Sequence, residues 1–304
     1  MLVRHLSYFV TLARERHFAR AAEACNIAQP TLSAAIHKLE EDLQARLVIR
    51  GHRFVGLTPE GERVLAWGRQ ILTDYSSLRE DLSSLRQGLV GVLRLGVIPA
   101  AMPLVSFLTS RFCEAHPLAD VDVRSMTSRA IQKGLDDFEI DGGLTYLENE
   151  PLENVQRAPL YEEHYVFVTG RDHPFAARRT VTWSEAAAER LCLLSEDMQN
   201  RRVLNNVAAS IGIALTPHVV SNSFLSIYSH LRHGEWSSIM PHTFFYLLGE
   251  TPDLVAIDLV EPIHSQQIGL VLSNREPASP MARALQTSVR RSDFDYELGA
   301  PTAR

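Results

Sequence analysis

The sequence has few cysteines and none of the common catalytic motifs. Three cysteines occur in 304 residues, without the CxxC spacing of metal and redox sites. GxSxG, GxGxxG, P-loop and HExxH motifs are all absent, so the familiar signatures of hydrolases, nucleotide-binding folds and zinc proteases are missing. The twelve histidines are scattered, and the His230/His233 pair is more typical of a solvated helix end than of a metal site. We therefore expect a non-enzyme without cofactor or metal, in a reducing compartment.

Long hydrophobic runs are also missing. No segment reaches the ~18 apolar residues that a membrane helix needs. Arg4, His5, Arg14 and Glu15 interrupt the first residues, unlike the continuous apolar core of a signal peptide. Hydrophobic residues still make up 45% of the chain, enough to bury a sizeable core. These features predict a cytoplasmic protein of roughly two or three domains without a membrane partner.

Charge is unevenly distributed along the chain. Residues 1–58 carry eight Lys and Arg against five Asp and Glu, a net charge of +3, whereas the rest carries −9. A basic segment ahead of an acidic remainder favours contact between the first segment and phosphate.

Apolar spacing in the basic segment predicts three helices. The first has an apolar stripe of Leu2, Leu6, Phe9, Val10 and Ala13. Residues 18–25 form a short Ala-rich second helix, and Pro30 starts a third. Its inner face would hold Leu32, Ile36, Leu39 and Leu43, and its outer face Thr31, Ser33, Ala34, His37 and Lys38. The pattern is typical of a helix-turn-helix that reads the major groove, although an ordinary helical bundle would give it too.

A basic turn follows between two short β-like runs and resembles a wing. The segments FARAAEACNIAQPTLSAAIHKLEEDLQARLVIR and LTPEG together resemble the N-terminal winged helix-turn-helix of LysR-type transcriptional regulators, over residues 1 to about 65. The resemblance implies that the chain binds double-stranded promoter DNA through Gln29, Pro30, Thr31, Ser33, Ala34, His37, Lys38, Arg50 and Arg53. Ala28 departs from the family, since a capping Ser or Thr is common there, and Ala34 and Val48 replace larger residues.

A long helix is predicted after Thr58, a good N-cap, and Pro59. Apolar residues recur along it at steps of three or four: Val64, Trp67, Ile71, Tyr75, Leu78, Leu82, Leu85 and Leu89. The spacing predicts a coiled-coil-like dimer seam, with packing of the helix on its own domain as the alternative. The resemblance implies that two chains form a homodimer through this linker helix and that two homodimers pair into a homotetramer. It also implies RNA polymerase as a further partner.

The remaining chain alternates strand-like and helix-like segments, which predicts an α/β fold with mostly parallel sheets. Expected strands cover 92–98, 120–124, 140–146, 164–168, 191–195, 218–221, 255–259 and 268–273. The resemblance implies two α/β subdomains of the periplasmic-binding-protein type. The predicted divisions are a winged helix-turn-helix at 1–58, a linker helix at 59–90, and an effector-binding domain at 91–304, with subdomain I at 92–162 and 268–304 and subdomain II at 163–267.

A small-molecule effector would bind between the two subdomains. Carried over by position, its site comprises Pro99, Ala100, Met102, Ser128, Gln199, Asn200, Arg201 and Asn222. Arg201 or Arg202 would pair with a carboxylate, although two adjacent arginines cannot both face one cleft. The stretch SNSFLSIYSHLRHGEWSSIMP resembles regulators of formate-dehydrogenase operons, which suggests a small carboxylate such as formate.

Two further expectations concern reactivity and class. LysR-type peroxide sensors carry a reactive cysteine in the segment that matches SEDMQN, and Asn200 stands at that position here. A thiol switch of that kind is therefore not expected. The alternative function is a cytoplasmic small-molecule-binding or enzymatic α/β protein with an incidental helical head.

Overall fold

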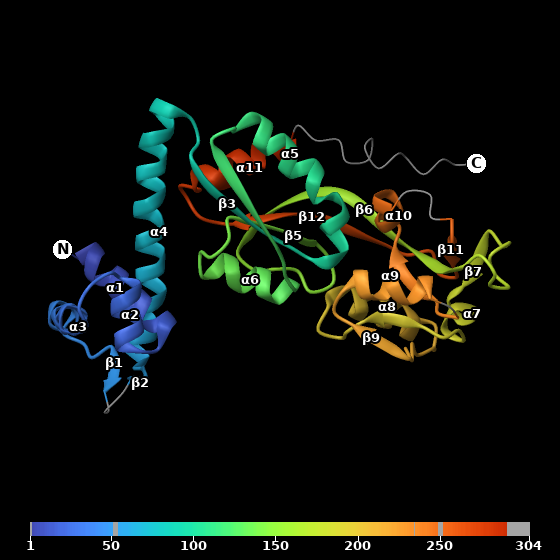
Figure 1. The fold of residues 1–304 in the computed structure, drawn as a ribbon, viewed down its shortest axis with the longest axis horizontal. Helices are drawn as coiled ribbons and strands as arrows, with labels where there is room; N and C mark the ends of the chain where they lie inside the picture. Colours follow the sequence, from blue (N-terminus) through green and yellow to red (C-terminus); the bar gives the residue numbers. More distant parts are fainter. Residues whose placement is uncertain (1, 51–53, 234, 249–251, 291–304) are drawn as a thin grey trace. The chain divides into compact units, whose positions relative to one another are not determined.

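The chain divides into two units, Met1–Leu89 and Val90–Arg304 (Figure 1). The computed structural model describes residues 2–50, 54–233, 235–248 and 252–290. None of the helices in these ranges combines the length and the hydropathy that a membrane span requires.

The first unit begins with helices, continues with a hairpin and ends with a long helix. Its elements are α1 (Leu2–Glu15), α2 (Phe18–Ala24), α3 (Gln29–Leu43), β1 (Val48–Arg50), β2 (Phe54–Leu57) and α4 (Pro59–Gln87). Their buried side chains form one core that includes Leu6, Phe9, Leu12, Ala21, Ala22, Leu32, Ile36, Leu39, Leu47 and Val48. Leu43 does not join it, contrary to the sequence prediction, and is 42% exposed because α3 ends at this residue.

The caps of the first unit follow from the local sequence. Thr58 caps α4, since its hydroxyl accepts a hydrogen bond from the Gly61 N–H at 2.9 Å. Ala28 occupies the N-cap position of α3, and no side chain caps that helix. A missing cap costs about 1 kcal/mol of helix stability.

The second unit is an α/β structure with two subdomains and, in the part of the chain that is described, an eight-stranded sheet and a separate parallel pair of strands (Figure 1). Its elements are β3 (Gly91–Val97), η1 (Pro99–Leu104), α5 (Val105–Ala115), β4 (Ala119–Ser125), α6 (Ser128–Asp136), β5 (Gly142–Tyr146), β6 (Val155–Gly170), β7 (Thr180–Thr182), α7 (Trp183–Ala187), β8 (Cys192–Leu194), α8 (Gln199–Ser210), β9 (Val219–Ser221), α9 (Phe224–Arg232), β10 (Ser238–Pro241), α10 (Thr243–Leu248), β11 (Leu254–Val260), β12 (Ser265–Ser273) and α11 (Pro280–Arg290). Over the described residues the sheet order is β4-β3-β5-β12-β6-β11-β7, and β10 also pairs with β6.

The long strand β6 passes from one subdomain to the other. From Val155 to His164 it pairs with β12, and from Tyr165 to Gly170 with β10 and β11. This change of partner lies close to the predicted crossover between residues 162 and 163, and the subdomain limits themselves remain a prediction.

The sheet is mixed rather than mostly parallel, which corrects the sequence prediction. β3 pairs in parallel with β4 and β5, as alternating strands and helices predict. β12 runs antiparallel to β5 and β6, and β10 and β11 run antiparallel to β6. The reason is that the chain leaves the first subdomain along β6 and returns along β12, so these neighbours have opposite directions.

Candidate nucleic-acid interface and effector cleft

The outward face of α3 carries the residues predicted to contact DNA. Gln29, Pro30, Thr31, Ala34, His37 and Lys38 are exposed and Ser33 is half-buried. The inner residues Leu32, Ile36 and Leu39 are fully buried. Arg50 lies in β1, but its side chain is outside the described part of the chain, as is the whole of Arg53.

Two basic side chains of this face, His37 and Lys38, lie beside acids of the same helix. The His37 ring lies 3.3 Å from Glu41, and Lys38 Nζ lies 3.0 Å from Asp42 and 3.5 Å from Glu41. The hydrogen bond and the charge of Asp42 raise the pKa of Lys38. Exposed pairs of this kind contribute little to stability, so both side chains can leave these acids for phosphate at little cost.

A buried glutamate of α3 holds the hairpin, and the sequence analysis missed it. The Glu40 side chain is 3% exposed. Its Oε1 accepts the backbone N–H groups of Leu47 at 2.9 Å and Val48 at 3.3 Å. Arg46 Nη1 donates to the other oxygen at 3.3 Å. The signal was an acidic residue next to the inner stripe of an amphipathic helix, where the spacing predicts burial.

The LTPEG segment fixes the same hairpin from the other side. The Thr58 hydroxyl donates to the Arg46 carbonyl at 2.5 Å while it caps α4. A Cβ on Gly61 would lie 2.1 Å from the Leu47 carbonyl oxygen, so a glycine is required for this close approach. The hairpin is therefore tied to both α3 and α4 and is positioned as a wing.

Helix α4 has two apolar faces. Val64, Leu65 and Leu72 pack against the core of the first unit. A second face leaves large side chains exposed in one protomer, by 65% for Trp67, 38% for Ile71, 48% for Tyr75, 57% for Leu78 and 58% for Leu82. These five residues, the α4 stripe, belong to the predicted dimer seam, and their exposure argues against packing on the helix's own unit. The side chain of Leu85 lies outside the described part.

A narrow cleft lies where the two subdomains of the second unit meet. Five of the predicted effector residues line it, namely Pro99, Ala100, Ser128, Gln199 and Asn200. Ile98, Thr127, Tyr146, Leu194 and Met198 complete its walls. The volume of the cleft is only about 10 Å³, which is room for about one water molecule.

Three residues predicted for the effector site do not line this cleft. Asn222 is exposed beyond β9, and Met102 is half-buried in η1. Arg201 is 4% exposed, and its guanidinium donates to the carbonyls of Leu194 and Leu215 and to the Asn205 side chain. Arg201 therefore has a structural role, because every one of these partners belongs to the second subdomain's own framework.

The neighbouring arginine joins two parts of the second unit. Arg202 donates two hydrogen bonds of 2.6 Å to the Glu150 carboxylate, which follows β5. Its third nitrogen bonds to the carbonyls of Glu196 and Asp197. Neither Arg201 nor Arg202 lines the cleft, so the expected arginine partner for a carboxylate is not supplied.

The polar groups of the cleft come from α6, β5 and α8. Gln199 Nε2 donates to the Asn149 carbonyl at 2.8 Å, which leaves its buried Oε1 without a partner. Asn200 Nδ2 donates to the Tyr146 hydroxyl at 3.0 Å. Thr127 caps α6, which leaves Ser128 as the first helical residue rather than the cap. The cleft thus lies against the starts of α6 and α8, where backbone N–H groups and the helix dipole favour an anion.

Directly behind the cleft is a buried carboxyl that the sequence analysis did not single out. The Tyr146 hydroxyl donates to Glu163 Oε1 at 2.6 Å. Burial raises the pKa of Glu163 to about 8. Burial likewise raises the pKa of Tyr161 and of Tyr165, which lie on the same face of β6. Glu163 precedes the strand expected at 164–168, so no alternation pattern marked it as buried.

Redox and metal chemistry find little support among the described residues. Cys25, Cys113 and Cys192 are free, and burial raises the pKa of Cys192 to about 11, which makes it a poor nucleophile. No group of three His, Cys, Asp or Glu is arranged for a metal in the described ranges. His164 and His242 stack with ring centroids 3.6 Å apart, and burial lowers the pKa of His242 to about 4.

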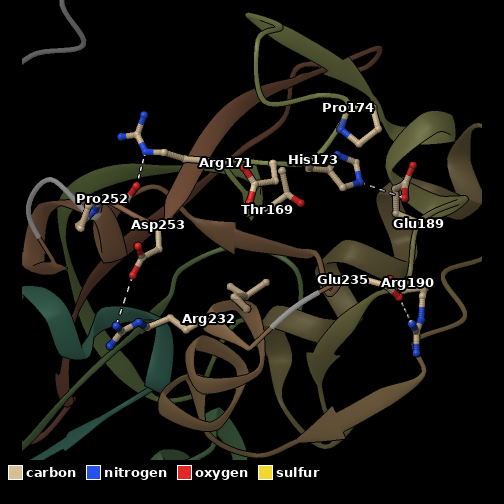
Figure 2. Close-up of a pocket in the computed structure, with 13 residues that line it drawn as sticks. Thr169, Arg171, His173, Pro174, Glu189, Arg190, Arg232, Glu235, Pro252 and Asp253 are labelled. Atoms are coloured by element: carbon tan, nitrogen blue, oxygen red, sulfur yellow. Dashed lines mark hydrogen bonds and ion pairs between the residues drawn. The ribbon is translucent and has the colours of Figure 1, made fainter.

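A wider cavity of about 790 Å³ lies between the loop after β6, the end of α9 and the start of β11 (Figure 2). Two ion pairs join residues of its walls, Arg190 with Glu235 at 2.7 Å and Arg232 with Asp253 at 3.3 Å. Figure 2 shows these pairs spread around the walls. None of the predicted effector residues lines this cavity.

A winged helix-turn-helix and an α/β unit with an interdomain cleft define a DNA-binding regulator with an effector-binding domain. Residues 3–62 match the family described as "Bacterial regulatory helix-turn-helix protein, lysR family". Residues 86–293 match the "LysR substrate binding domain". The chain belongs to the LysR family of DNA-binding transcriptional regulators, which are not enzymes as a family.

Similar proteins include two from Escherichia coli (strain K12). One is the DNA-binding transcriptional dual regulator OxyR, 27% identical over 299 residues, with 98% of each chain covered. The other is the uncharacterized HTH-type transcriptional regulator YnfL, 31% identical over 286 residues, with 92% of this chain and 95% of the relative covered.

Solved structures of similar proteins have the same fold. Full-length OxyR from Pseudomonas aeruginosa, a cysteine-to-aspartate variant, matches with a TM-score of 0.76 at 25% identity, over 97% of this chain and 96% of that one. CbnR in complex with its target DNA matches with a TM-score of 0.67 at 21% identity, over 96% and 99% of the two chains, which supports the fold alone.

Proposed function

We propose that this regulator binds promoter DNA through the outward face of α3 and the β1–β2 wing, and that a small carboxylate such as formate controls it from the cleft. The DNA contacts would be made by Gln29, Pro30, Thr31, Ser33, Ala34, His37, Lys38, Arg50 and Arg53. Hydroxyl and amide side chains read base edges, whereas the cations set affinity and register. Since its target is promoter DNA, the protein acts in the cytoplasm.

The assembly we propose is a dimer through the α4 stripe. Five large apolar side chains at helical spacing make an interface that a second copy of α4 can cover. Two dimers then pair into a tetramer that grips an interrupted palindrome and contacts RNA polymerase. A dimer also explains why a helix with so much exposed apolar surface leads out of a small basic head.

The chemistry of the cleft supports a small monoanion as effector. The cleft must widen to admit even formate, and the observation that carries the effector proposal is that the starts of α6 and α8 meet there. Ser128, Gln199 and Asn200 offer hydroxyl and amide groups there, while both nearby arginines are bonded elsewhere. Amide donors at a helix start suit one negative charge better than two.

Peroxide sensing by a thiol is not part of this proposal. Several curated relatives carry the name "Hydrogen peroxide-inducible genes activator". The reactive cysteine of such sensors corresponds by position to Asn200 in this chain. Asn200 cannot form a sulfenic acid or a disulfide, and its amide is bonded to Tyr146.

The test is binding of the purified protein to its own upstream DNA while small carboxylates are added. We expect affinity to fall steeply with salt, because phosphate contacts release counterions. A footprint that changes with one carboxylate supports the whole proposal. Binding with no change retains the regulator and rejects the cleft assignment, and a change with peroxide would contradict the absence of a thiol switch.

A further inference from the structure

Glu163 is a carboxyl without a counter-charge. It is 0% exposed, and among the described residues its hydrogen-bonding partners are phenols, Tyr146 at Oε1 and Tyr165 as a second. The ion pairs of the described residues include none with Glu163. A buried carboxylate that lacks both a cation and a full set of hydrogen bonds is costly, so this group retains its proton to unusually high pH.

The groups that surround Glu163 are phenols and amides. Tyr146 approaches from β5, and Tyr161 and Tyr165 lie beside it on β6. On β12, Gln266 lies opposite Glu163 in the register and is neutral. His264, which stacks on Tyr165, has a pKa lowered by burial and so carries no charge at neutral pH. The charge of Glu163 would thus be the one unbalanced charge in this cluster.

A chain of hydrogen bonds joins this carboxyl to the cleft. Asn200 donates to the Tyr146 hydroxyl, and that hydroxyl donates to Glu163. Asn200 and Tyr146 both line the cleft, so an anion bound there lies one side chain away from the carboxyl. Two negative charges at that distance, with phenols between them, repel each other strongly.

We propose that Glu163 is a specificity-determining residue of the effector cleft, which must be protonated when a small monocarboxylate binds, so that the ligand and one proton bind together. The proton comes from solvent and resides on a Glu163 oxygen, and no other bond is made or broken. The inference rests on the proposed function of the cleft as a carboxylate site. It adds that a dianion such as oxalate binds more weakly than formate, because neither Arg201 nor Arg202 lines the cleft to balance a second negative charge.

The coupling between formate binding and protonation of Glu163 determines how the formate affinity depends on pH. Well below pH 8 the carboxyl is already protonated in the free protein, so formate affinity is independent of pH. Above pH 8 each formate ion brings a proton with it, and the Kd rises about tenfold for each pH unit. Oxalate is expected to bind at least about tenfold more weakly than formate throughout.

The experiment titrates the full-length protein with formate, acetate and oxalate from about pH 6.5 to pH 9 by calorimetry, in two buffers that differ in ionisation enthalpy. We expect close to one proton taken up per formate at high pH and almost none at low pH. Glu163→Gln keeps the shape and removes the titration, so its Kd should not change with pH. Glu162→Gln is the matched control, because Glu162 is exposed on the opposite face of β6 and should behave as wild type.

The outcomes distinguish the carboxylate site itself from the proton uptake at Glu163. Formate binding without proton uptake, or with the same pH profile in Glu163→Gln, overturns this inference and leaves the carboxylate site standing. Failure of every carboxylate to bind overturns both. If Glu163→Gln does not fold, Tyr146→Phe takes its place. Loss of the phenol O–H removes a hydrogen bond that lowers the pKa of Glu163, so the rise in Kd should begin at higher pH, and an unchanged onset would reject the inference.

Discussion

Polar side chains are exposed to solvent on the outward face of α3 and buried in the effector cleft. On α3, His37 and Lys38 are exposed and paired with acids in water. In the cleft, Gln199 and Asn200 are 3% and 4% exposed, and Gln199 Oε1 has no partner. An exposed pair contributes about 0–1 kcal/mol, whereas an unmade buried hydrogen bond costs about 1–3 kcal/mol. The helix-turn-helix can therefore exchange partners cheaply, whereas the polar groups of the cleft are held in place by their buried contacts.

The largest effect should come from a buried arginine. Arg201→Ala leaves the carbonyls of Leu194 and Leu215 without a donor, and we expect a loss of about 2–4 kcal/mol of stability by thermal or chemical unfolding. Arg232→Ala is the control, because Arg232 and Asp253 are both exposed and their pair is worth less than about 1 kcal/mol. Equal losses in the two variants would contradict the contrast between buried and exposed charge.

A second test follows the stability of Glu163→Gln with pH. Folding raises the pKa of Glu163 from 4.5 to about 8, so the folded state binds the extra proton between these values. The wild type should therefore lose stability as pH rises through this window, while Glu163→Gln should not. The variant should gain on the order of a few kcal/mol relative to wild type by pH 8, measured as unfolding midpoints. Parallel curves for the two proteins would show that the carboxyl is ionised when folded.

Glu40→Ala tests the buried part of the head. Removal of the carboxylate leaves the Leu47 and Val48 N–H groups unpaired, which should cost about 1–3 kcal/mol and loosen the wing. DNA affinity should fall with it. Glu41→Ala, one residue further along, removes an exposed acid and should leave stability and DNA binding almost unchanged. Weaker binding by Glu41→Ala alone would reverse the proposed roles.

His37→Ala combined with Lys38→Ala should weaken DNA binding about tenfold without a large change in thermal stability, since both side chains are exposed. The slope of log affinity against log salt should become shallower by about one. Lys133→Ala, on α6, provides a control at another exposed cation. Unchanged binding by the double variant would refute the groove assignment.

The smallest effect concerns the start of α3. Ala28→Ser supplies the missing cap and should stabilise the head by about 0.5–1 kcal/mol, as an increase in unfolding temperature. Ala24→Ser, at the end of α2, offers no cap and should not stabilise. A loss of stability in Ala28→Ser would show that the residue is needed for a close contact.

Local features were predictable from the sequence and long-range ones were not. The cap at Thr58 is confirmed, because a cap depends on residues three apart. The register of β6 with β12 joins residues about a hundred positions apart, which no local pattern encodes. Arg201 illustrates the same limit at the site, since position alone could not distinguish a guanidinium that faces a ligand from one bonded to Leu194 and Leu215.

The narrowness of the cleft has a kinetic consequence. A cleft with room for about one water molecule cannot admit an effector as it stands. The subdomains must therefore separate each time an effector binds or leaves. Association would then be gated by this opening and would level off at high effector concentration rather than increase in proportion to it. Release would also require the subdomains to separate, so the effector would stay bound for longer than its few contacts suggest. The regulator would respond to how long the effector persists as well as to how much is present.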